Sequence, residues 1–375
     1  MGKVLGLVNL HRSSDLGPLT HKRSLASTGF LGRYSFIDFP LSNLANSGID
    51  EVGILIKDNP RSLFRHLRLG DKEWSLNTKS GGIFLMYNEQ YAGKTAYNHD
   101  INNMIENDWF LRGSSADTIV IAPINLIYRI DYRDVIKAHN ESGADISVVY
   151  KRVDDAKTNF IGQDYLTFDE LDTNRVVGYN DNKGSEDNRA ICLESYVMSK
   201  EMLFKLIQTA QNRSSFFSLR DVIVYLVKKL NIQGYEYKGY LRAINNIQDY
   251  MKVSLELLDN NVRVEAFGNN IDWPVYTRTY DTPPARYGVN ACVNNSYVAN
   301  GSTIKGTVKN SIIGRDVLIE EGAVVENSIL LSHVKISKNA HLNYTVIDKE
   351  ATIKVMKNLK GTLDDPLVIK KQDIV

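Results

Sequence analysis

The sequence predicts two structural parts in series, an α/β domain with a mostly parallel sheet and, after it, a parallel β-helix. Two observations lead to this prediction. Short buried strands alternate with helical segments through the first two thirds of the chain, and apolar residues recur every six positions near its end. Strands that alternate with helices form a parallel sheet that is covered on both faces. The 375 residues are enough for two domains.

The strands of the first part are short apolar runs rich in β-branched residues. Such runs are typical of strands that are buried on both faces. They cover residues 4–8, 52–57, 118–123 and 146–151.

Helical segments lie between and after those strands. We expect helices at 40–46 and 131–140, each followed within three residues by a glycine, such as Gly143, that can end a helix. A later helix at 218–230 begins with Ser218, a favoured N-cap residue, and closes with basic residues.

The loop after the first strand lies where ligands bind in such a sheet, at the carboxyl ends of parallel strands. Between Asn9 and Leu16 this loop contains no glycine. A phosphate-binding turn needs glycine because its backbone N–H groups must approach the phosphate closely. Pro18 and a basic pair, Lys22 and Arg23, follow the loop. The chain therefore keeps the surroundings of a nucleotide-binding loop and lacks its central feature.

The last ninety residues carry a six-residue period. The repeating apolar positions, with two slips of one residue, are Ile313, Ile319, Val325, Leu331, Ile336, Leu342, Ile347 and Ile353. This period is the signature of hexapeptide coils in a parallel β-helix, where each coil buries its apolar residue against the next. The alternative is an ordinary small β-sandwich with coincidental spacing.

A connector separates the two parts. It starts with a helical sequence at 246–259 and continues with Pro274, Pro283 and Pro284, which make it extended and stiff. The expected boundaries are 1–245 for the α/β domain, 246–290 for the connector and 291–375 for the β-helix.

Composition excludes several classes of protein. A net charge of +1 gives no strong field for nucleic acid or an anionic membrane. Cys192 and Cys292 lie far apart and form no CxxC motif, which fits a reducing cytoplasm without a disulfide or metal framework. No apolar run approaches membrane-spanning length, and no secretory signal pattern is present. We therefore expect a cytoplasmic protein.

Three longer strings resemble a known family: FIDFPLSNLANSGID (36–50), LIYRIDY (126–132) and DWPVYTRTYDTPPARY (272–287). They resemble bacterial glucose-1-phosphate adenylyltransferase, the ADP-glucose pyrophosphorylase of glycogen synthesis. The resemblance implies a Rossmann-like nucleotidyltransferase domain followed by a left-handed β-helix of hexapeptide repeats. That family joins ATP and glucose 1-phosphate, which requires a divalent metal and positive groups around the phosphates.

The phosphate loop departs from the family's pattern. The family's LAGGRGTRL is LVNLHRSSDL here, with Leu10, His11 and Ser13 at or beside the glycine positions. Side chains there block the approach of the backbone to a triphosphate. The family's K-R-A-K-P is KRSLA here, so Leu25 replaces the second lysine.

The two positions that hold the metal in the family also differ. The Asp of G-D-H-I-Y is Asn125 here, and an amide oxygen brings no charge to Mg²⁺. The Asp of W-R-D-V-G-T is Ala243, which has no ligand atom.

The sugar-phosphate side differs in the same way. The family's F-V-E-K-P is YNDNK, with Asp181 for the glutamate and Asn182 for the lysine. A D-F-G-K-D string is FSLRD, with Phe217 at the first aspartate and with Arg220 and Asp221 kept.

The losses together predict a silent site. One lost electrostatic contact typically lowers a rate roughly 10²–10³-fold. We expect no catalytic residue and no metal or cofactor site in this chain; Mg²⁺ and ATP are bound by a catalytic partner. The resemblance implies a non-catalytic, GlgD-type regulatory subunit that forms a hetero-oligomer, a tetramer, with the catalytic subunit and shifts its conformational population.

Lys22, Arg23 and Arg33 are the candidate residues for a phosphorylated sugar or phosphate effector. The alternative is that they form an ordinary solvated basic turn.

Three other functions fit parts of the sequence. An active nucleotidyltransferase would need new metal ligands, for which Asp15, Asp38 and Asp181 are the candidates. A hexapeptide acyltransferase would use a histidine between coils, such as His333 or His341. A sensor would bind a sugar phosphate or nucleotide without turnover.

Overall fold

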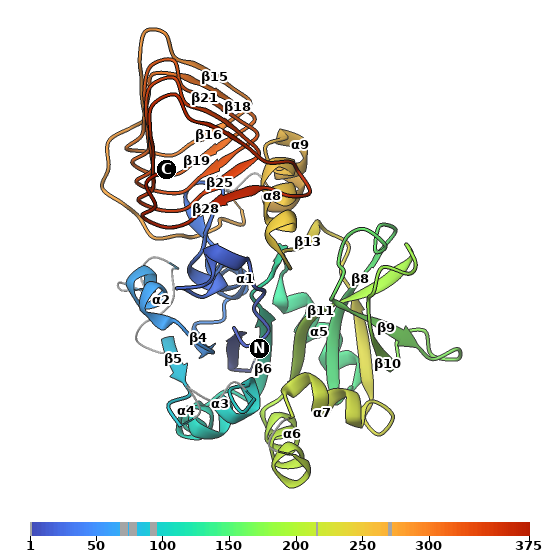
Figure 1. Ribbon diagram of the computed structural model, residues 1–375. Coiled ribbons are helices and arrows are strands. Elements are labelled where there is room, and N and C mark those ends of the chain that lie inside the picture. Colours follow the sequence, from blue (N-terminus) through green and yellow to red (C-terminus); the bar gives the residue numbers. More distant parts are fainter. Residues whose placement is uncertain (1, 68–73, 75–80, 91–95, 215–216, 269–271) are drawn as a thin grey trace. The chain divides into compact units, whose positions relative to one another are not determined.

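The computed structural model describes residues 2–67, 74, 81–90, 96–214, 217–268 and 272–375 (Figure 1). Contacts between residues divide the chain into two compact units. The first unit consists of Met1–Ser13, Ile37–Ala243 and Trp273–Tyr276, and the second of Ser14–Phe36, Ile244–Asp272 and Thr277–Val375. The predicted boundaries at 245/246 and 290/291 stay a prediction, but the contacts place 14–36 in the same unit as the C-terminal residues.

The first unit is built on a nine-stranded sheet. Seven of its strands run in one direction, and β11 and β10 run against them. The strand order is β10-β9-β11-β6-β1-β4-β5, with β8 pairing β11 and β12 pairing β8. The strands are β1 (Val4–Asn9), β4 (Glu51–Ile56), β5 (Gly82–Tyr87), β6 (Thr118–Pro123), β8 (Ile146–Val153), β9 (Asp164–Phe168), β10 (Val176–Asp181), β11 (Arg189–Ser199) and β12 (Ile232–Glu236). All four predicted strands are present, with ends that differ by at most two residues.

Helices cover both faces of this sheet, as predicted. Leu5 and Leu7 of β1 belong to a core formed with α3, α4, α6 and α7. Gly6 alternates with Leu5 and Leu7, so its Cα faces the opposite side of the sheet. Leu44 of α1 packs there, so close that an added Cβ on Gly6 would lie 2.9 Å from its side chain. The helices are α1 (Asp38–Asn46), α2 (Pro60–Leu67), α3 (Asp100–Glu106), α4 (Asp108–Gly113), α5 (Tyr132–Ser142), α6 (Lys200–Arg213) and α7 (Leu219–Leu226).

Helix ends follow the predicted signals. Ser218 caps α7 in a capping box with Asp221, and Gly143 ends α5 in the left-handed conformation. The helix predicted at 218–230 is shorter than expected, because α7 ends at Leu226. A small antiparallel pair, β7 (Leu126–Tyr128) with β13 (Leu241–Ala243), joins two segments that are distant in sequence.

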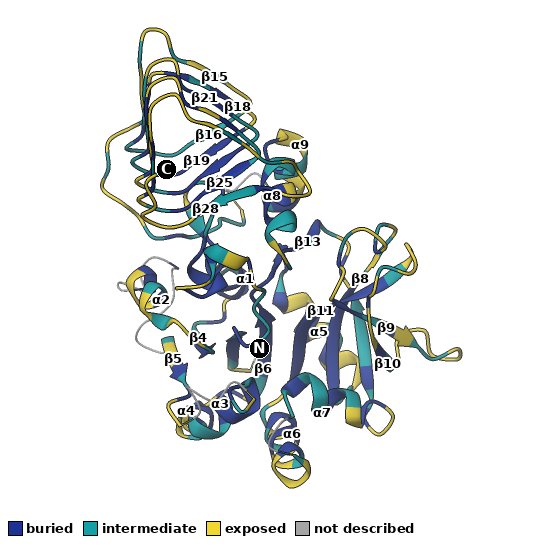
Figure 2. Cartoon of the chain, viewed as in Figure 1, coloured by how far each residue is buried: buried dark blue, intermediate teal, exposed yellow. Residues whose placement is uncertain are grey.

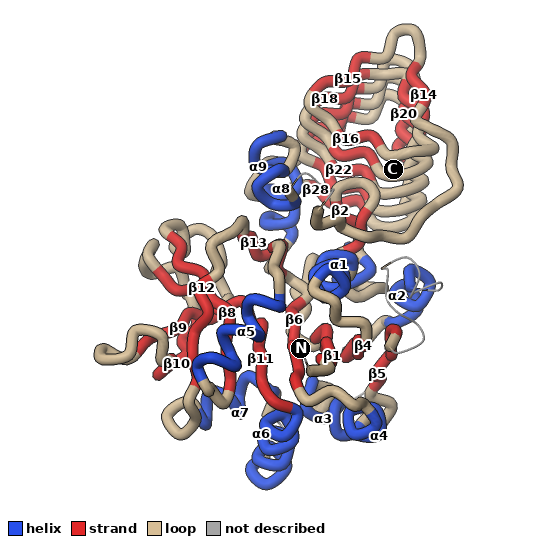
Figure 3. Tube along the Cα trace, turned by 180° about the vertical axis from the view of Figure 1, so that it is seen from behind, coloured by secondary structure: helices blue, strands red, loops and turns tan. Residues whose placement is uncertain are grey.

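The second unit contains a β-helix with three parallel sheets of five strands each, visible as stacked coils in Figures 1 and 3. The first sheet is β14 (Arg286–Tyr287), β17 (Thr303–Ile304), β20 (Leu318–Ile319), β23 (Lys335–Ile336) and β26 (Thr352–Ile353). The second is β15 (Cys292–Asn294), β18 (Thr307–Lys309), β21 (Val324–Glu326), β24 (His341–Asn343) and β27 (Asn358–Lys360). The third is β16 (Tyr297–Val298), β19 (Ile312–Ile313), β22 (Ile329–Leu330), β25 (Thr345–Ile347) and β28 (Leu367–Ile369). The first strand of these three sheets begins at Arg286.

The six-residue period identifies the inward-facing residues of the β-helix. Every predicted position except Leu331 belongs to the β-helix core, which is dark blue in Figure 2. Leu331 is a wrong prediction, because the register pairs Leu330 with Ile313 and Ile347 and so places Leu330 inside the coil. Leu331 is buried outside this core, where an added Cβ on Gly29 would lie 3.2 Å from it.

The second unit also contains elements outside the β-helix coils. They are the short 3₁₀ turns Gly17–Leu19 and Leu25–Ser27, β2 (Gly29–Phe30), β3 (Tyr34–Ser35), α8 (Ile247–Glu256) and α9 (Asn260–Phe267). The sequence predicted α8 but not α9. Tyr250 of α8 packs against Phe30 and Phe36, with ring centroids 6.2 Å apart, and its hydroxyl donates a hydrogen bond to the carbonyl of Gly29. Within the described part of the chain, helices are too short or too polar to cross a bilayer.

Candidate functional site

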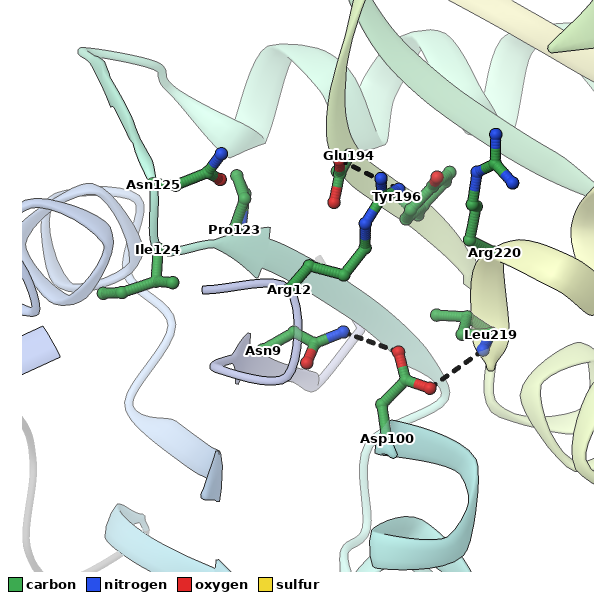
Figure 4. Close-up of a pocket in the computed structure, with 10 residues that line it drawn as sticks. All are labelled: Asn9, Arg12, Asp100, Pro123, Ile124, Asn125, Glu194, Tyr196, Leu219 and Arg220. Atoms are coloured by element: carbon green, nitrogen blue, oxygen red, sulfur yellow. Dashed lines mark hydrogen bonds and ion pairs between the residues drawn. The ribbon is translucent and has the colours of Figure 1, made fainter. Parts of the chain in front are cut away.

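A pocket opens at the carboxyl end of β1 and β6 in the first unit (Figure 4). Asn9, the last residue of β1, pairs with Pro123, the last residue of β6, so the loops after both strands begin at the same edge. The lining residues are Asn9, Arg12, Asp100, Pro123, Ile124, Asn125, Glu194, Tyr196, Leu219 and Arg220. The pocket has an empty volume of about 330 Å³, its open mouth included. It therefore occupies the place that the sequence predicts for a ligand site.

Backbone amides of the loop after β1 donate hydrogen bonds within the protein. The amide of Leu10 donates to the carbonyl of Leu55 (3.1 Å), that of His11 to Oδ1 of Asn9 (3.0 Å) and that of Ser13 to the carbonyl of Leu10 (3.3 Å). A phosphate-binding loop points such N–H groups at the ligand. In this chain these three donors are already satisfied by the protein.

His11 is a packing residue in this loop. It is buried, and its ring contacts the carbonyl of Asn98 (3.3 Å) and the side chain of Asn103 (3.2 Å). Burial lowers the pKa of His11 to about 4, so the ring is neutral at pH 7 and offers no charge to an anion.

Two arginines and three carboxylates form an ion-pair cluster along one side of the pocket. Arg12 lies 3.1 Å from Asp164 and 3.0 Å from Glu194. Arg220 donates from Nε and Nη2 to both oxygens of Asp164, each at 2.6 Å, and lies 3.0 Å from Asp181. Burial opposes the ionisation of Asp164, but Arg220 and Arg12 outweigh it and hold the pKa of this carboxyl below its usual range. The guanidinium groups thus have carboxylate partners from the same chain.

Glu194 is the unusual member of this cluster. It lies on β11 where the pairing with β8 shifts register between Cys192 and Tyr196, and its φ is +51°. Burial raises the pKa of Glu194 to about 7, although the charge of Arg12 lowers it.

The two positions that hold the metal in the resembled family lie close together. Ala243 of β13 pairs with Leu126 of β7, and Asn125 immediately precedes Leu126. Asn125 is buried and lines the pocket. Neither side chain is a carboxylate, and in the described ranges no three His, Cys, Asp or Glu side chains gather as a metal site would require. These residues do not fit a catalytic Mg²⁺ ion.

Two sequence families match the chain. Residues 12–259 match the nucleotidyl transferase family, and residues 283–359 match the GlmU-like C-terminal hexapeptide family. The chain belongs to the nucleotidyl transferase family.

Known relatives of this nucleotidyl transferase family member extend over most of its length. It is 34% identical to the glycogen biosynthesis protein GlgD of Geobacillus stearothermophilus, over 98% of this chain and 96% of the relative. It is 29% identical to the glycogen biosynthesis protein GlgD of Bacillus subtilis, over 95% and 92%. It is 30% identical to the glucose-1-phosphate adenylyltransferase of Pseudothermotoga lettingae, over 87% and 77%. The family resemblance in the sequence is thereby confirmed.

Other predicted positions have structural contacts in this nucleotidyl transferase fold. The side chain of Asn182 is buried and donates to the carbonyls of Ala156 (2.8 Å) and Phe160 (3.0 Å). Phe217 packs against the core of the first unit, and Asp221 completes the cap of α7. A loop contact, a core contact and a helix cap thus occupy the positions where the resembled family holds the sugar phosphate.

The candidate effector residues lie in the second unit. Arg23 is buried and donates from Nη2 to Oδ1 of Asp348, 2.6 Å away, whereas Lys22 and Arg33 are exposed. Burial and the charge of Arg23 lower the pKa of Lys349, next to Asp348, to about 8. Sequence reasoning missed Asp348: a buried arginine needs a counter-ion, but nothing in the sequence says which carboxylate supplies it.

The residues of the alternative functions have separate partners. Asp15 accepts from the hydroxyl of Thr20 (2.7 Å), and Asp38 lies 2.6 Å from the ring of His66. Asp181 pairs with Arg220, as described above.

The two β-helix histidines of the acyltransferase alternative are not buried. His333 lies 3.8 Å from Asp316, and its side chain is 58% exposed. His341 is exposed on β24. Exposed histidines on the coils are ordinary surface residues unless a bound substrate covers them.

Proposed function

We propose that this chain is a catalytically silent, regulatory subunit of glucose-1-phosphate adenylyltransferase in glycogen biosynthesis. It would modulate ADP-glucose formation from ATP and glucose 1-phosphate by a catalytic paralogue. The observation that carries the proposal is that hydrogen-bond donors and charges at the pocket have partners within the chain. The amides of Leu10, His11 and Ser13 donate within the protein, and Arg12 and Arg220 pair with carboxylates of the same chain.

The chemistry of adenylyl transfer supports silence. In-line attack on the α-phosphate develops charge that a divalent cation and positive side chains must stabilise. Asn125 and Ala243 provide no carboxylate for the cation. Each missing contact lowers a rate by roughly 10²–10³-fold, and together they leave no useful turnover although such losses are not additive.

The relatives support the pathway. Two of them are named glycogen biosynthesis protein GlgD, and others are named glucose-1-phosphate adenylyltransferase. A chain that keeps the whole fold but lacks the residues for adenylyl transfer can still act through its surfaces, by binding another protein. We propose that these surfaces bind the catalytic subunit in a hetero-tetramer in the cytoplasm and favour its active conformation. ATP and Mg²⁺ belong to that partner.

We propose that Lys22, Arg23 and Arg33 receive a phosphorylated effector. Lys22 and Arg33 are exposed, and Arg23 is held by Asp348. An effector phosphate must therefore compete with the carboxylate of Asp348 for Arg23.

The test is a titration. The catalytic paralogue is held at a fixed concentration, this chain is added in steps, and ADP-glucose formation is measured with and without a sugar bisphosphate or inorganic phosphate. A saturable change in rate or effector response supports the proposal. A rate that stays constant at every ratio, with both proteins folded, contradicts it.

A further inference from the structure

The backbone of Glu194 has a φ angle that residues with a side chain disfavour. Its φ of +51° lies in the left-handed region, which disfavours every residue with a Cβ relative to glycine. The residue sits at the register shift of β11, and its amide lies 3.3 Å from Sγ of Cys192. Because other non-glycine residues of the described chain also have a positive φ, the case for a function rests on what the Glu194 side chain contacts.

The Glu194 side chain points into the pocket and meets Arg12 there (Figure 4). The two groups are 3.0 Å apart, and the Glu194 side chain is 9% exposed. A carboxylate so deeply buried needs a charged partner, and Arg12 provides it. The same Arg12 Nη1 atom contacts Asp164, so these two carboxylates hold the guanidinium from two strands, β11 and β9.

The charges around the pocket do not favour a phosphate. Arg12 and Arg220 bring two positive charges to the ion-pair cluster, and Asp164, Asp181 and Glu194 bring up to three negative ones. Both carboxylates lie on Nη1 of Arg12, so a phosphate-bearing ligand would compete with them for the charge of this guanidinium. Of the two carboxylates that contact Arg12, Glu194 lines the pocket.

From these observations we infer that the Glu194 carboxylate occupies the position of an anionic ligand at Arg12 and so prevents phosphate-bearing ligands from binding in the pocket. We call Glu194 the plug. The inference rests on the proposed function, because it describes how the silent site is kept closed. It goes further in assigning the exclusion of ligands to one side chain. The missing metal carboxylates would account for an absence of turnover, whereas the plug would account for an absence of ligand binding.

Isothermal titration of the full chain with inorganic pyrophosphate, without metal, tests this inference. Glu194→Gln removes the charge and keeps the shape, and Glu194→Gly removes the side chain and relieves the backbone. Both variants are expected to bind pyrophosphate at least tenfold more tightly than the natural chain. Thermal unfolding of each variant confirms that it is folded.

Two controls locate the effect. Glu186→Gln neutralises a glutamate of the first unit that pairs with Arg189 at 3.0 Å but is exposed, and it should leave pyrophosphate binding unchanged. Adding Arg12→Ala to Glu194→Gln should return the affinity to that of the natural chain. The inference is overturned if neither Glu194 variant gains affinity, or if the gain survives the loss of Arg12.

The result of the pyrophosphate titration does not depend on whether the proposed regulatory function is correct. Pyrophosphate binding is measured on this chain alone, whereas regulation is measured as the rate of the paralogue. A chain that fails to change the paralogue's rate can still gain ligand binding on removal of Glu194, and the reverse also holds.

Discussion

Arg23, from the segment that follows the first loop, and Asp348, from the β-helix, form a buried ion pair with 2.6 Å between Nη2 and Oδ1. Their side chains are 7% and 3% exposed. The pair ties two stretches of the second unit that are 325 residues apart in sequence. It also gives Arg23, a candidate effector residue, an internal anion.

Replacement of Asp348 tests both roles of this pair. Asp348→Asn leaves the Arg23 charge buried without a counter-ion, and loss of one partner of a buried pair typically lowers the free energy of unfolding by about 3–5 kcal/mol. Urea denaturation measures this loss. Inorganic phosphate should then stabilise the variant more than the natural chain, because a phosphate can take the place of the carboxylate.

The second unit contains a matched control for that substitution. Asp364 pairs with Lys252 at 2.9 Å, but its side chain is 83% exposed. Asp364→Asn should change stability by less than about 1 kcal/mol, as exposed pairs do. Equal losses for the two variants would contradict the account of Arg23.

Gly32 tests how the segment after the first loop contacts the β-helix. Its φ is +73°, and an added Cβ would lie 2.9 Å from the carbonyl oxygen of Ile313. Gly32→Ala should lower the free energy of unfolding by about 3 kcal/mol, because left-handed strain of about 1–2 kcal/mol adds to the clash. Gly17→Ala is the control, since Gly17 has a φ of +60° and nothing within 4 Å, so that only the strain remains. Urea denaturation of the two variants side by side gives the comparison.

The buried Glu194 makes stability depend on pH. Its pKa is raised from 4.5 to about 7, so between these values the folded chain binds more protons than the unfolded chain. Stability therefore falls as the pH rises through this window, by about 3.5 kcal/mol in total at about 1.4 kcal/mol for each pKa unit.

Comparison with Glu194→Gln isolates this contribution. Between pH 5 and pH 8, which covers most of this window, the natural chain should lose about 2.5 kcal/mol more than the variant does, measured by urea denaturation. His11, whose pKa is lowered to about 4, acts in the opposite direction as the pH falls, and its contribution cancels because both proteins contain it. Parallel pH profiles for the two proteins would show that Glu194 does not titrate in this range.

Restoring the metal carboxylates should restore metal binding without turnover. Ala243 pairs with Leu126, the residue after Asn125, so Asn125→Asp with Ala243→Asp places two carboxylates near the same end of the β7–β13 pair. Titration with Mn²⁺, followed by its electron paramagnetic resonance signal, should reveal a site in the double variant that is weaker in either single variant. ADP-glucose formation should stay absent, because the loop and the ion-pair cluster are unchanged. Turnover by the double variant would show that the metal ligands alone account for the silence.

Local signals in the sequence predicted much of the fold. The strands of the first unit, the cap at Ser218 and the six-residue period all depend on residues that are close in sequence. The misassigned Leu331 shows the limit of a period, because adjacent leucines at 330 and 331 fit it almost equally well. The pairing of β22 with its neighbours decides which of them points inward.

The contacts that define the site could not be predicted, because they join residues that are distant in sequence. The partner of Arg12 on β9, Asp164, lies in a segment with no motif, and Glu194 looks like an ordinary strand residue until its φ is known. Losses relative to the family were visible in the sequence, since each is a single substitution. What replaced the lost contacts was visible only in the folded chain.

The central claim is that the chain makes no ADP-glucose itself and changes how its paralogue does so. The most direct measurement is ADP-glucose formation from ATP, glucose 1-phosphate and Mg²⁺ in three samples: this chain alone, the paralogue alone, and the two together. The account predicts no product in the first sample and a rate or effector response in the third that differs from the second. Product in the first sample would contradict it, because the chain would then hold the metal and the phosphates with residues other than Asn125, Ala243 and the loop after β1.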